Sequence, residues 1–276
     1  MRRLRVEAGQ SAPRIKFVPR PIQYIVENLL PAPILRKCRD LIWVPVRRQY
    51  GQLSVAEAFI RTYRNKLWGG IDGDSFFSGR GSLDKFATPY VEWLVRFISE
   101  HDIRTVVDLG CGDFRIGEKI CSSSSVNYIG VDIVPELIAF NQSQFGNDRV
   151  SFRCANIIED ELPNGELCLI RQVLQHLSNQ QIASVLLNCA KFPYLLVTEV
   201  VYNGRKVRPN LDMVHGPDTR VFKHSGVFLD RAPYNLKTQT VLEIPNVEMV
   251  AVIRTCLIPR EDQPTVRRQQ PMEGRV

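Results

Sequence analysis

The residues best suited to chemistry lie in the segment 105–114, Thr-Val-Val-Asp-Leu-Gly-Cys-Gly-Asp-Phe. The apolar run before and after Asp108 is typical of a buried parallel strand. Gly110 and Gly112 allow a sharp turn with no Cβ to block a ligand. The helix predicted next would present free N–H groups at its start, which suit a polar or anionic group. The segment therefore predicts a nucleotide-type binding loop at the carboxyl end of a strand.

The spacing of the glycines indicates which kind of nucleotide this loop is suited to bind. The dinucleotide pattern G-x-G-x-x-G requires a third glycine at position 115, where this chain has Arg115. Instead, an acidic residue precedes the glycines in the pattern D-x-G-x-G. This pattern resembles motif I of the class I S-adenosylmethionine-dependent methyltransferases. Phe114 departs from it, because many members of that family have a third glycine there, and it predicts a bulkier loop.

Two later strands end in polar residues at the spacing of the same family. A strand predicted at 127–131 ends at Asp132, twenty residues after Gly112, and a strand at 150–155 ends at Asn156. A carboxylate at a strand end can accept hydrogen bonds from two ribose hydroxyls. Asn156 replaces the Asp that the family often uses to accept from the adenine amino group, and its carbonyl oxygen offers the same function. The resemblance implies these cofactor-binding residues: Asp108, Gly110, Cys111, Gly112, Asp132, Ile133, Asn156, Ile157 and Gln172.

Methyl transfer from a sulfonium requires alignment and, for some acceptors, removal of a proton. The residues after a fourth strand, predicted at 167–170, should lie near the reacting methyl. His176 is the candidate base there, and its alternative interpretation is a cap or core histidine of the next helix. His215, in the polar segment 201–237, is a second candidate base. The charged residues of this segment are explained equally well if the segment is a solvated loop. This segment would determine the choice of substrate.

The order of predicted elements indicates the fold class. Ser54 with Glu57, and Ser178 with Gln181, form capping boxes that begin helices. Strands alternate with helices up to a fifth strand at 194–200, which predicts a parallel sheet with right-handed crossovers. Strands at 238–244 and 248–258, joined by a turn at Pro245-Asn246, would add an antiparallel hairpin. The order resembles the α/β, Rossmann-like, seven-stranded fold of class I methyltransferases.

A closer resemblance comes from the flanking motifs. The sequence contains W-G-G at 68–70, S-G-R-G-S at 78–82 and C-G-D-F at 111–114. This combination is similar to a bacterial family of methyltransferase-domain proteins whose substrates are mostly undefined. Family members usually have Asp at the position of Gln172, so this chain departs from the pattern there.

Charge divides the chain unevenly. Residues 1–50 hold eleven Lys and Arg against three Asp and Glu, a balance of +8, whereas the whole chain has a net charge of +7. We therefore expect a basic, proline-containing extension at 1–53, a cofactor-binding domain at 54–259 and a flexible tail at 260–276. The extension is interpreted as an arm packed on the core. The alternative is peripheral contact with anionic lipid or nucleic acid, because apolar residues separate its basic clusters.

The cysteines and the hydropathy pattern bear on the compartment. The seven cysteines are scattered without a C-x-x-C pair, which favours reduced thiols in the cytoplasm over disulfides or a zinc site. His, Asp and Glu do not cluster at metal-ligand spacing. An apolar run of the roughly 20 residues that span a bilayer is also missing.

Together these patterns predict an S-adenosylmethionine-dependent methyltransferase. Neither an N-P-P-Y-like run nor a Pro-Cys pair follows the fourth strand, which argues against methylation of adenine amino groups, of glutamine, or of cytosine through a cysteine nucleophile. The expected acceptor is a small molecule or glycan with a reactive oxygen or nitrogen, and nucleic acid is not expected. The alternative hypothesis is a degenerate Rossmann-like protein that binds the cofactor without turnover. The sequence indicates no oligomeric state.

Overall fold

The computed structural model describes residues 43–70 and 75–263. The chain divides into two compact units, 1–49 and 50–276. Of the first unit only residues 43–49 are described, and they are helical. Most of the predicted basic extension lies outside the described residues, as does the tail from 264. No helix in the described ranges is long and apolar enough to cross a membrane.

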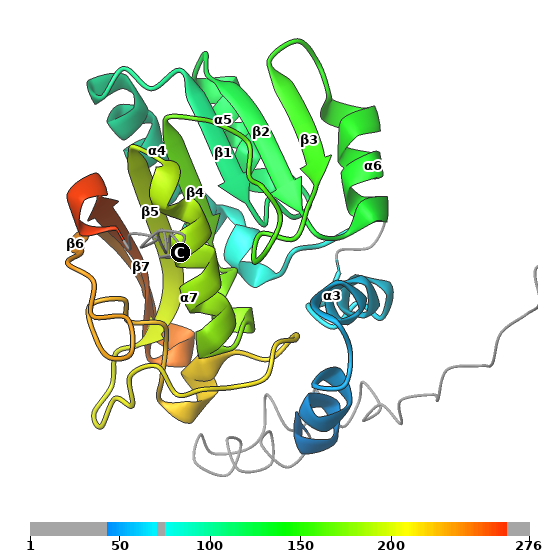
Figure 1. The fold of residues 1–276 in the computed structure, drawn as a ribbon, viewed down its shortest axis with the longest axis vertical. Coiled ribbons are helices and arrows are strands. Elements are labelled where there is room, and N and C mark those ends of the chain that lie inside the picture. The colour runs from blue at the N-terminus through cyan, green and yellow to red at the C-terminus, as the bar shows by residue number, and fades with distance from the viewer. Residues whose placement is uncertain (1–42, 71–74, 264–276) are drawn as a thin grey trace, which may run out of the picture. The chain divides into compact units, whose positions relative to one another are not determined.

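A seven-stranded sheet organises the second unit (Figure 1). Its order is β3-β2-β1-β4-β5-β7-β6. The first five strands along the chain are parallel, and β7 lies antiparallel between β5 and β6. The strands are β1 (Thr105–Leu109), β2 (Asn127–Asp132), β3 (Val150–Cys154), β4 (Leu167–Arg171), β5 (Tyr194–Tyr202), β6 (Gln239–Asn246) and β7 (Ala251–Pro259).

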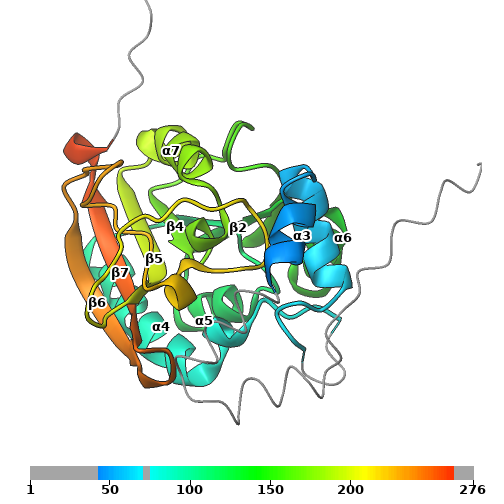
Figure 2. The same ribbon diagram turned by 90° about the horizontal axis from the view of Figure 1, so that it is seen from below.

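Helices cover both faces of this sheet (Figure 2). Helices α4 and α5 pack on one face, where the core includes Leu94 and Ile120, and α7 packs on the other, where it includes Ile182. Helix α6 lies beside β3 at the sheet edge. The helices are α3 (Val55–Arg64), α4 (Asp84–Glu100), α5 (Arg115–Ser123), α6 (Pro135–Phe145) and α7 (Asn179–Asn188).

Both predicted capping boxes are confirmed. Glu57 N donates to Ser54 Oγ over 3.2 Å, and Ser54 N donates back to Glu57 Oε2 over 2.9 Å. Ser178 and Gln181 make the same reciprocal pair at the start of α7. Each box satisfies two backbone N–H groups that a helix leaves without an internal partner. The starts of α3 and α7 are therefore set by local sequence.

The predicted hairpin is correct, but its predicted turn is wrong. Pro245 pairs with Val252, and Asn246 pairs with Ala251, inside the β6–β7 ladder. The chain reverses after them, through a 3₁₀ turn at 247–249 and Val250 at φ 52°. The second strand therefore begins at 251 and not at 248. The prediction failed because proline normally interrupts a strand, whereas an edge strand such as β6 tolerates its missing N–H.

Candidate functional site

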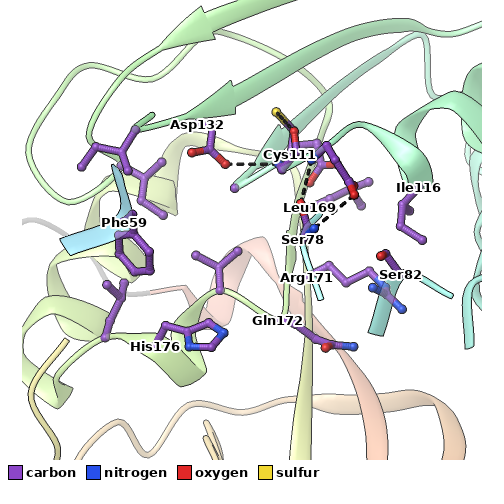
Figure 3. Close-up of a pocket in the computed structure, with 18 of the residues that line it drawn as sticks. Phe59, Ser78, Ser82, Cys111, Ile116, Asp132, Leu169, Arg171, Gln172 and His176 are labelled. Atoms are coloured by element: carbon purple, nitrogen blue, oxygen red, sulfur yellow. Dashed lines mark hydrogen bonds between the residues drawn. The ribbon is translucent and has the colours of Figure 1, made fainter. Parts of the chain in front are cut away.

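A cavity of about 110 Å³ lies at the carboxyl ends of strands β1 to β4 (Figure 3). Its polar lining comes from the strand ends, from the loops that follow β1 and β4, and from Ser78 and Ser82, whereas α3 and the loop after it contribute aromatic side chains. The lining includes Phe59, Tyr63, Trp68, Ser78, Ser82, Tyr90, Asp108, Gly110, Cys111, Gly112, Asp113, Ile116, Asp132, Ile133, Asn156, Ile157, Arg171, Gln172, Val173 and His176. Every cofactor-binding residue expected from the sequence is in this set.

The loop after β1 has the conformation that its glycines allow. Gly110 and Gly112 have φ values of 80° and 56°, in the left-handed region. A Cβ at Gly110 would lie 2.3 Å from the Val173 side chain, and one at Gly112 would lie 2.2 Å from Ser78 Oγ. Gly112 N donates to Asp132 Oδ2 over 3.2 Å. The two glycines therefore keep the strand ends close enough to form one cavity.

Two buried carboxyl groups line the cavity. Burial raises the pKa of Asp108 to about 6, against a hydrogen bond from Tyr128 Oη at 2.5 Å. Burial also raises the pKa of Asp132 to about 6, although it accepts from the backbone N–H groups of Val134 and Gly112. Both carboxylates are thus ionised at neutral pH in a desolvated setting, where an added donor from a ligand would be strongly favourable.

Phe114 does not crowd this cavity. Its backbone is left-handed, at φ 62°, and its ring is buried against Tyr128, Phe145 and Phe152, with centroid distances of 4.9 to 5.2 Å. Phe114 is absent from the cavity lining described above. The departure from the family pattern is therefore accommodated in the core beside α5, and the bulk expected in the loop does not reach the ligand side.

Hydrogen bonds connect the S-G-R-G-S segment, residues 78–82, to the loop that follows β1. Ser78 N donates to Asp113 Oδ2 over 3.1 Å, and Asp113 N donates to Ser78 Oγ over 2.7 Å. Tyr63 Oη lies 2.9 Å from the same Ser78 Oγ. Ser78 and Ser82 both line the cavity. The segment thus joins α3 to the glycine loop across the cavity.

Asn156 closes the turn after β3 while facing the cavity. Its Oδ1 accepts from Ile158 N over 3.2 Å, and its Nδ2 donates to Glu159 Oε1 over 2.8 Å. An amide oxygen accepts two hydrogen bonds, so one site on Oδ1 remains for a ligand donor. Ile133 and Ile157 add apolar surface on either side of this turn.

His176 lies at the opposite end of the cavity, in the loop after β4. Its Nδ1 faces two carbonyls, Gly216 O at 3.1 Å and Asp218 O at 3.2 Å. Two acceptors require Nδ1 to carry the proton, which leaves Nε2 as the acceptor. Burial lowers the pKa of His176 to about 4. The imidazole is therefore neutral at pH 7 with a defined tautomer.

His215 lies elsewhere. Its Nε2 donates to Leu53 O over 2.9 Å, and its Nδ1 is 3.0 Å from Gln181 Nε2. It does not line the cavity. The segment 201–237 reaches the cavity wall through its backbone, because the carbonyls of 216 and 218 contact His176 and Pro217 O accepts from Trp68 Nε1 over 3.2 Å. Of the two candidate bases, the structure brings only His176 to the cofactor residues.

The sequence analysis did not identify the role of two buried ionisable side chains that hold the loop at 172–177. Glu199 on β5 accepts from three consecutive backbone N–H groups, at 173, 174 and 175, over 2.8 to 3.2 Å. Arg220 donates to the carbonyls of 174, 175, 177 and 211 and to Asn179 Oδ1. Burial raises the pKa of Glu199 to about 8, opposed by these N–H groups and by Arg220. The loop carrying His176 is thus held from both sides.

A signal for one of these residues was present in the sequence. Glu199 is a single carboxylate in an otherwise apolar strand, and a charge in such a position requires partners. Arg220 gave no comparable signal because it lies in a polar segment. In the described part of the chain, no group of three or more His, Cys, Asp or Glu side chains is arranged to hold a metal ion.

Comparison with known proteins identifies the class. Residues 106–192 match the family model described as a methyltransferase domain. This match assigns a methyltransferase domain to residues 106–192, and the mostly parallel seven-stranded sheet is the fold expected for the class I S-adenosylmethionine-dependent methyltransferases. The protein is therefore an enzyme, and its methyl donor is S-adenosylmethionine.

Among solved structures, human N-acetylserotonin methyltransferase is 14% identical, with a TM-score of 0.44; the match covers 75% of this chain and 60% of that one. The N-methyltransferase NodS from Bradyrhizobium japonicum WM9 is 13% identical, with a TM-score of 0.47, and the match covers 72% of this chain and 98% of that one. An O-methyltransferase family protein from Burkholderia thailandensis is 15% identical, with a TM-score of 0.43, and the match covers 67% and 58%. No curated protein matches the sequence.

The residues of the cavity fit S-adenosylmethionine. The two left-handed glycines line the cavity without side chains of their own, and Asp132 at the end of β2 offers carboxylate oxygens to a ribose. Asn156 and the two isoleucines beside it would contact the adenine. When bound, the cofactor supplies an electrophilic methyl group on a sulfonium. The residues that line the cavity would bind it, exclude water and orient the acceptor.

Proposed function

We propose that the enzyme methylates an oxygen or nitrogen of a small polar acceptor, either a free small molecule or a glycan-type compound. The observation that supports this is His176. Its Nδ1–H is held by two carbonyls, and its unprotonated Nε2 belongs to a residue lining the same cavity as the cofactor-binding groups. We propose Nε2 as the atom that receives the acceptor proton.

The low basicity of His176 is compatible with this role. A hydroxyl or amine becomes strongly acidic as its oxygen or nitrogen forms the new bond to carbon, so a weak base can take the proton at that stage. The carbonyls of Gly216 and Asp218 accept from Nδ1 and would stabilise the imidazolium that results. Gln175 Nε2, 3.4 Å from His176 Nε2, is the nearest amide that could donate to the free nitrogen before the acceptor arrives.

The aromatic side chains around His176 support a small acceptor. The Trp68 ring centroid lies 5.0 Å from that of His176, and Phe59 packs edge-on against the same imidazole at 6.4 Å. These rings provide an apolar wall at the reacting end of the cavity and exclude water from it. We propose that the acceptor lies against this wall.

The test is incubation with methyl-labelled S-adenosylmethionine and fractionated small-molecule and glycan extracts, followed by identification of the labelled product. His176→Ala should lower turnover by about 10²- to 10⁴-fold while cofactor affinity is kept. His215→Ala tests the second candidate and should change turnover little. His101→Ala is the matched control, because His101 packs on Tyr194 at the other end of the sheet.

Two results would contradict the proposal. Full turnover in the His176→Ala variant would show that alignment alone drives the reaction and that Nε2 receives no proton. Cofactor binding without label uptake from any fraction would favour the alternative hypothesis, a degenerate binding protein, which is based on the departures at Phe114, Asn156 and Gln172.

A further inference from the structure

The end of the cavity that holds His176 is built mainly from apolar and aromatic side chains. Helix α3, the residue Trp68 after it and the loop that carries His176 supply them. Figure 3 shows Phe59 and His176 on one side of the cavity, away from Ser82. Tyr63 and Trp68 are half-buried, so part of each ring is accessible. We call this region the acceptor end, and its side chains besides His176 are Val55, Phe59, Tyr63, Trp68, Val173 and Leu177.

Three consecutive carbonyls fix two of the rings at this end. Trp68 Nε1 donates to Pro217 O over 3.2 Å, and His176 Nδ1 faces Gly216 O at 3.1 Å and Asp218 O at 3.2 Å. The ring centroids of Trp68 and His176 lie 5.0 Å apart, with 43° between the planes. Both orientations are therefore set by the protein before a ligand arrives. A flat ligand packed on an aromatic side chain gains more than its buried area alone provides.

The backbone around His176 offers a ligand few hydrogen-bonding groups. The N–H groups of residues 173, 174 and 175 donate to Glu199, and the carbonyls of 174, 175 and 177 accept from Arg220. The His176 carbonyl accepts from Gly216 N over 3.0 Å, and the His176 N–H donates to Val173 O over 3.0 Å. The main chain of this loop is therefore already hydrogen-bonded within the protein.

Among the described residues, the side chains of the acceptor end leave one ring nitrogen for a ligand. Tyr63 Oη is 2.9 Å from Ser78 Oγ, and the indole N–H is used by Pro217 O. His176 Nε2 has the 3.4 Å contact with Gln175 Nε2, which is long for a hydrogen bond. A sugar ring brings several hydroxyls, and each one buried without a partner costs free energy. A flat compound with a single hydroxyl at the reacting position needs this nitrogen alone.

The basicity of His176 favours the same kind of methyl acceptor. Burial lowers the pKa of this imidazole to about 4, so it is a weak base. A hydroxyl on an aromatic ring has a pKa of about 10, as in tyrosine, whereas the pKa of water, which stands here for an aliphatic hydroxyl, is about 16. Proton transfer to a weak base is easier from the more acidic group. The aromatic hydroxyl is therefore the better matched partner.

We propose that the methyl acceptor is a hydroxyl group on a planar aromatic ring, which packs against Trp68 and places its oxygen beside His176 Nε2. The inference rests on the proposed function and narrows its acceptor. In the reaction the ring oxygen forms a bond to the methyl carbon, and the carbon–sulfur bond breaks with its electron pair going to sulfur. The hydroxyl proton passes to Nε2 and then to water. The products are an aryl methyl ether and S-adenosylhomocysteine.

The first experiment uses the unaltered protein with methyl-labelled S-adenosylmethionine and three model acceptors. These are 2-naphthol, its saturated analogue decahydro-2-naphthol, and methyl glucoside. The first two share a carbon skeleton, so they separate flatness and acidity from bulk. The kcat/KM for 2-naphthol should exceed the other two values by about 10²-fold or more, because only this hydroxyl is acidic enough to make full use of a base that contributes about 10²- to 10⁴-fold.

Small-molecule and glycan extracts are labelled in parallel, and NMR identifies the methylated atom of each product. A methyl group on an aromatic oxygen supports the inference, even where 2-naphthol is a poor acceptor. A methyl group on a sugar, on another aliphatic oxygen or on nitrogen would overturn it and leave the proposed function standing. Methylation of methyl glucoside as fast as of 2-naphthol would overturn it in the same way. If neither the model compounds nor any fraction takes up label, the proposed function itself fails.

The second experiment changes the indole. Trp68→Leu keeps an apolar side chain and removes the flat ring, so it should raise the KM for the labelled aromatic hydroxyl by about 2- to 10-fold. Trp68→Phe should recover most of this loss, and the Kd for S-adenosylhomocysteine should stay the same in both variants. Trp93→Leu is the matched control, because Trp93 stacks on Phe97 in α4, 5.3 Å between centroids, and does not line the cavity. An unchanged KM in Trp68→Leu, or an equal loss of affinity for S-adenosylhomocysteine, would refute the role of Trp68 in binding the acceptor.

Discussion

Replacing Arg220 tests whether the loop carrying His176 is held by tertiary contacts. The Arg220 side chain is 1% exposed, and its guanidinium donates to five oxygens. Arg220→Met keeps most of the buried length of the side chain and removes every donor. The variant therefore isolates the polar contribution from the packing contribution.

The size of the expected stability loss depends on which of the five oxygens keep another hydrogen-bond donor after the guanidinium is removed. Leu174 O also accepts from Leu177 N, and Asn179 Oδ1 also accepts from Tyr234 Oη. The carbonyls that lose the guanidinium donor without such a second donor are those of Leu211, Gln175 and Leu177. Each such buried acceptor costs about 1–3 kcal/mol. Some water entry is expected, so we expect a loss of about 3–5 kcal/mol, as for other broken buried charge networks.

The assay is urea denaturation monitored by circular dichroism, with a thermal melt in parallel. For a domain of this size, the expected loss lowers Tm by about 6–20 °C. Arg254→Met removes a guanidinium from its partly exposed ion pair with Glu243 and should change stability by no more than about 1 kcal/mol. Arg220→Lys should recover little, because an ammonium cannot reach the same set of carbonyls. Turnover should fall in Arg220→Met even at temperatures where the variant is fully folded.

The reasoning is refuted if Arg220→Met is as stable as the Arg254→Met control. That result would mean that the loop carbonyls find other donors at no cost. It would equally be refuted if stability fell but turnover of the folded variant were unchanged, because the loop would then keep His176 in place without the guanidinium.

Three further predictions address the cavity. Asp132→Ala should weaken binding of S-adenosylhomocysteine by about 1.5–3 kcal/mol, measured by calorimetry, and unchanged affinity would remove Asp132 from the site. Phe114→Ala should lower the free energy of unfolding by about 3–5 kcal/mol yet leave cofactor affinity nearly unchanged, because the ring packs in the core. A large loss of affinity under conditions in which the variant is fully folded would contradict this. The carboxyl of Asp108 has a pKa near 6 in the folded protein and 3.8 as a free group. The folded state thus keeps a proton that the unfolded state has released, so the stability of the unaltered protein relative to Asp108→Asn should fall by about 2.4 kcal/mol from pH 4 to pH 7. A flat difference across that range would show that the carboxyl is not desolvated.

Local patterns predicted the part of the site that consecutive residues build. The D-x-G-x-G spacing, the acidic residue at 132 and the capping boxes each depend on neighbours a few residues away, so they were readable without a structure. The turn at Pro245-Asn246 was predicted from the same kind of pattern and was wrong. Whether a proline interrupts a strand depends on where that strand lies in the sheet, and here it lies at the edge.

The remaining features depend on residues distant in sequence. Arg220 binds carbonyls more than 40 residues away, and Glu199 binds N–H groups about 25 residues away. Backbone carbonyls and N–H groups leave no signature in side-chain identity, so neither contact was predictable. The sequence by itself determined the fold class, the cofactor loop and the strand ends that carry Asp132 and Asn156. Only the tertiary structure decided that Phe114 faces the core, that His176 and not His215 lines the cavity, and that Trp68 lies beside His176, because each depends on which surfaces pack together.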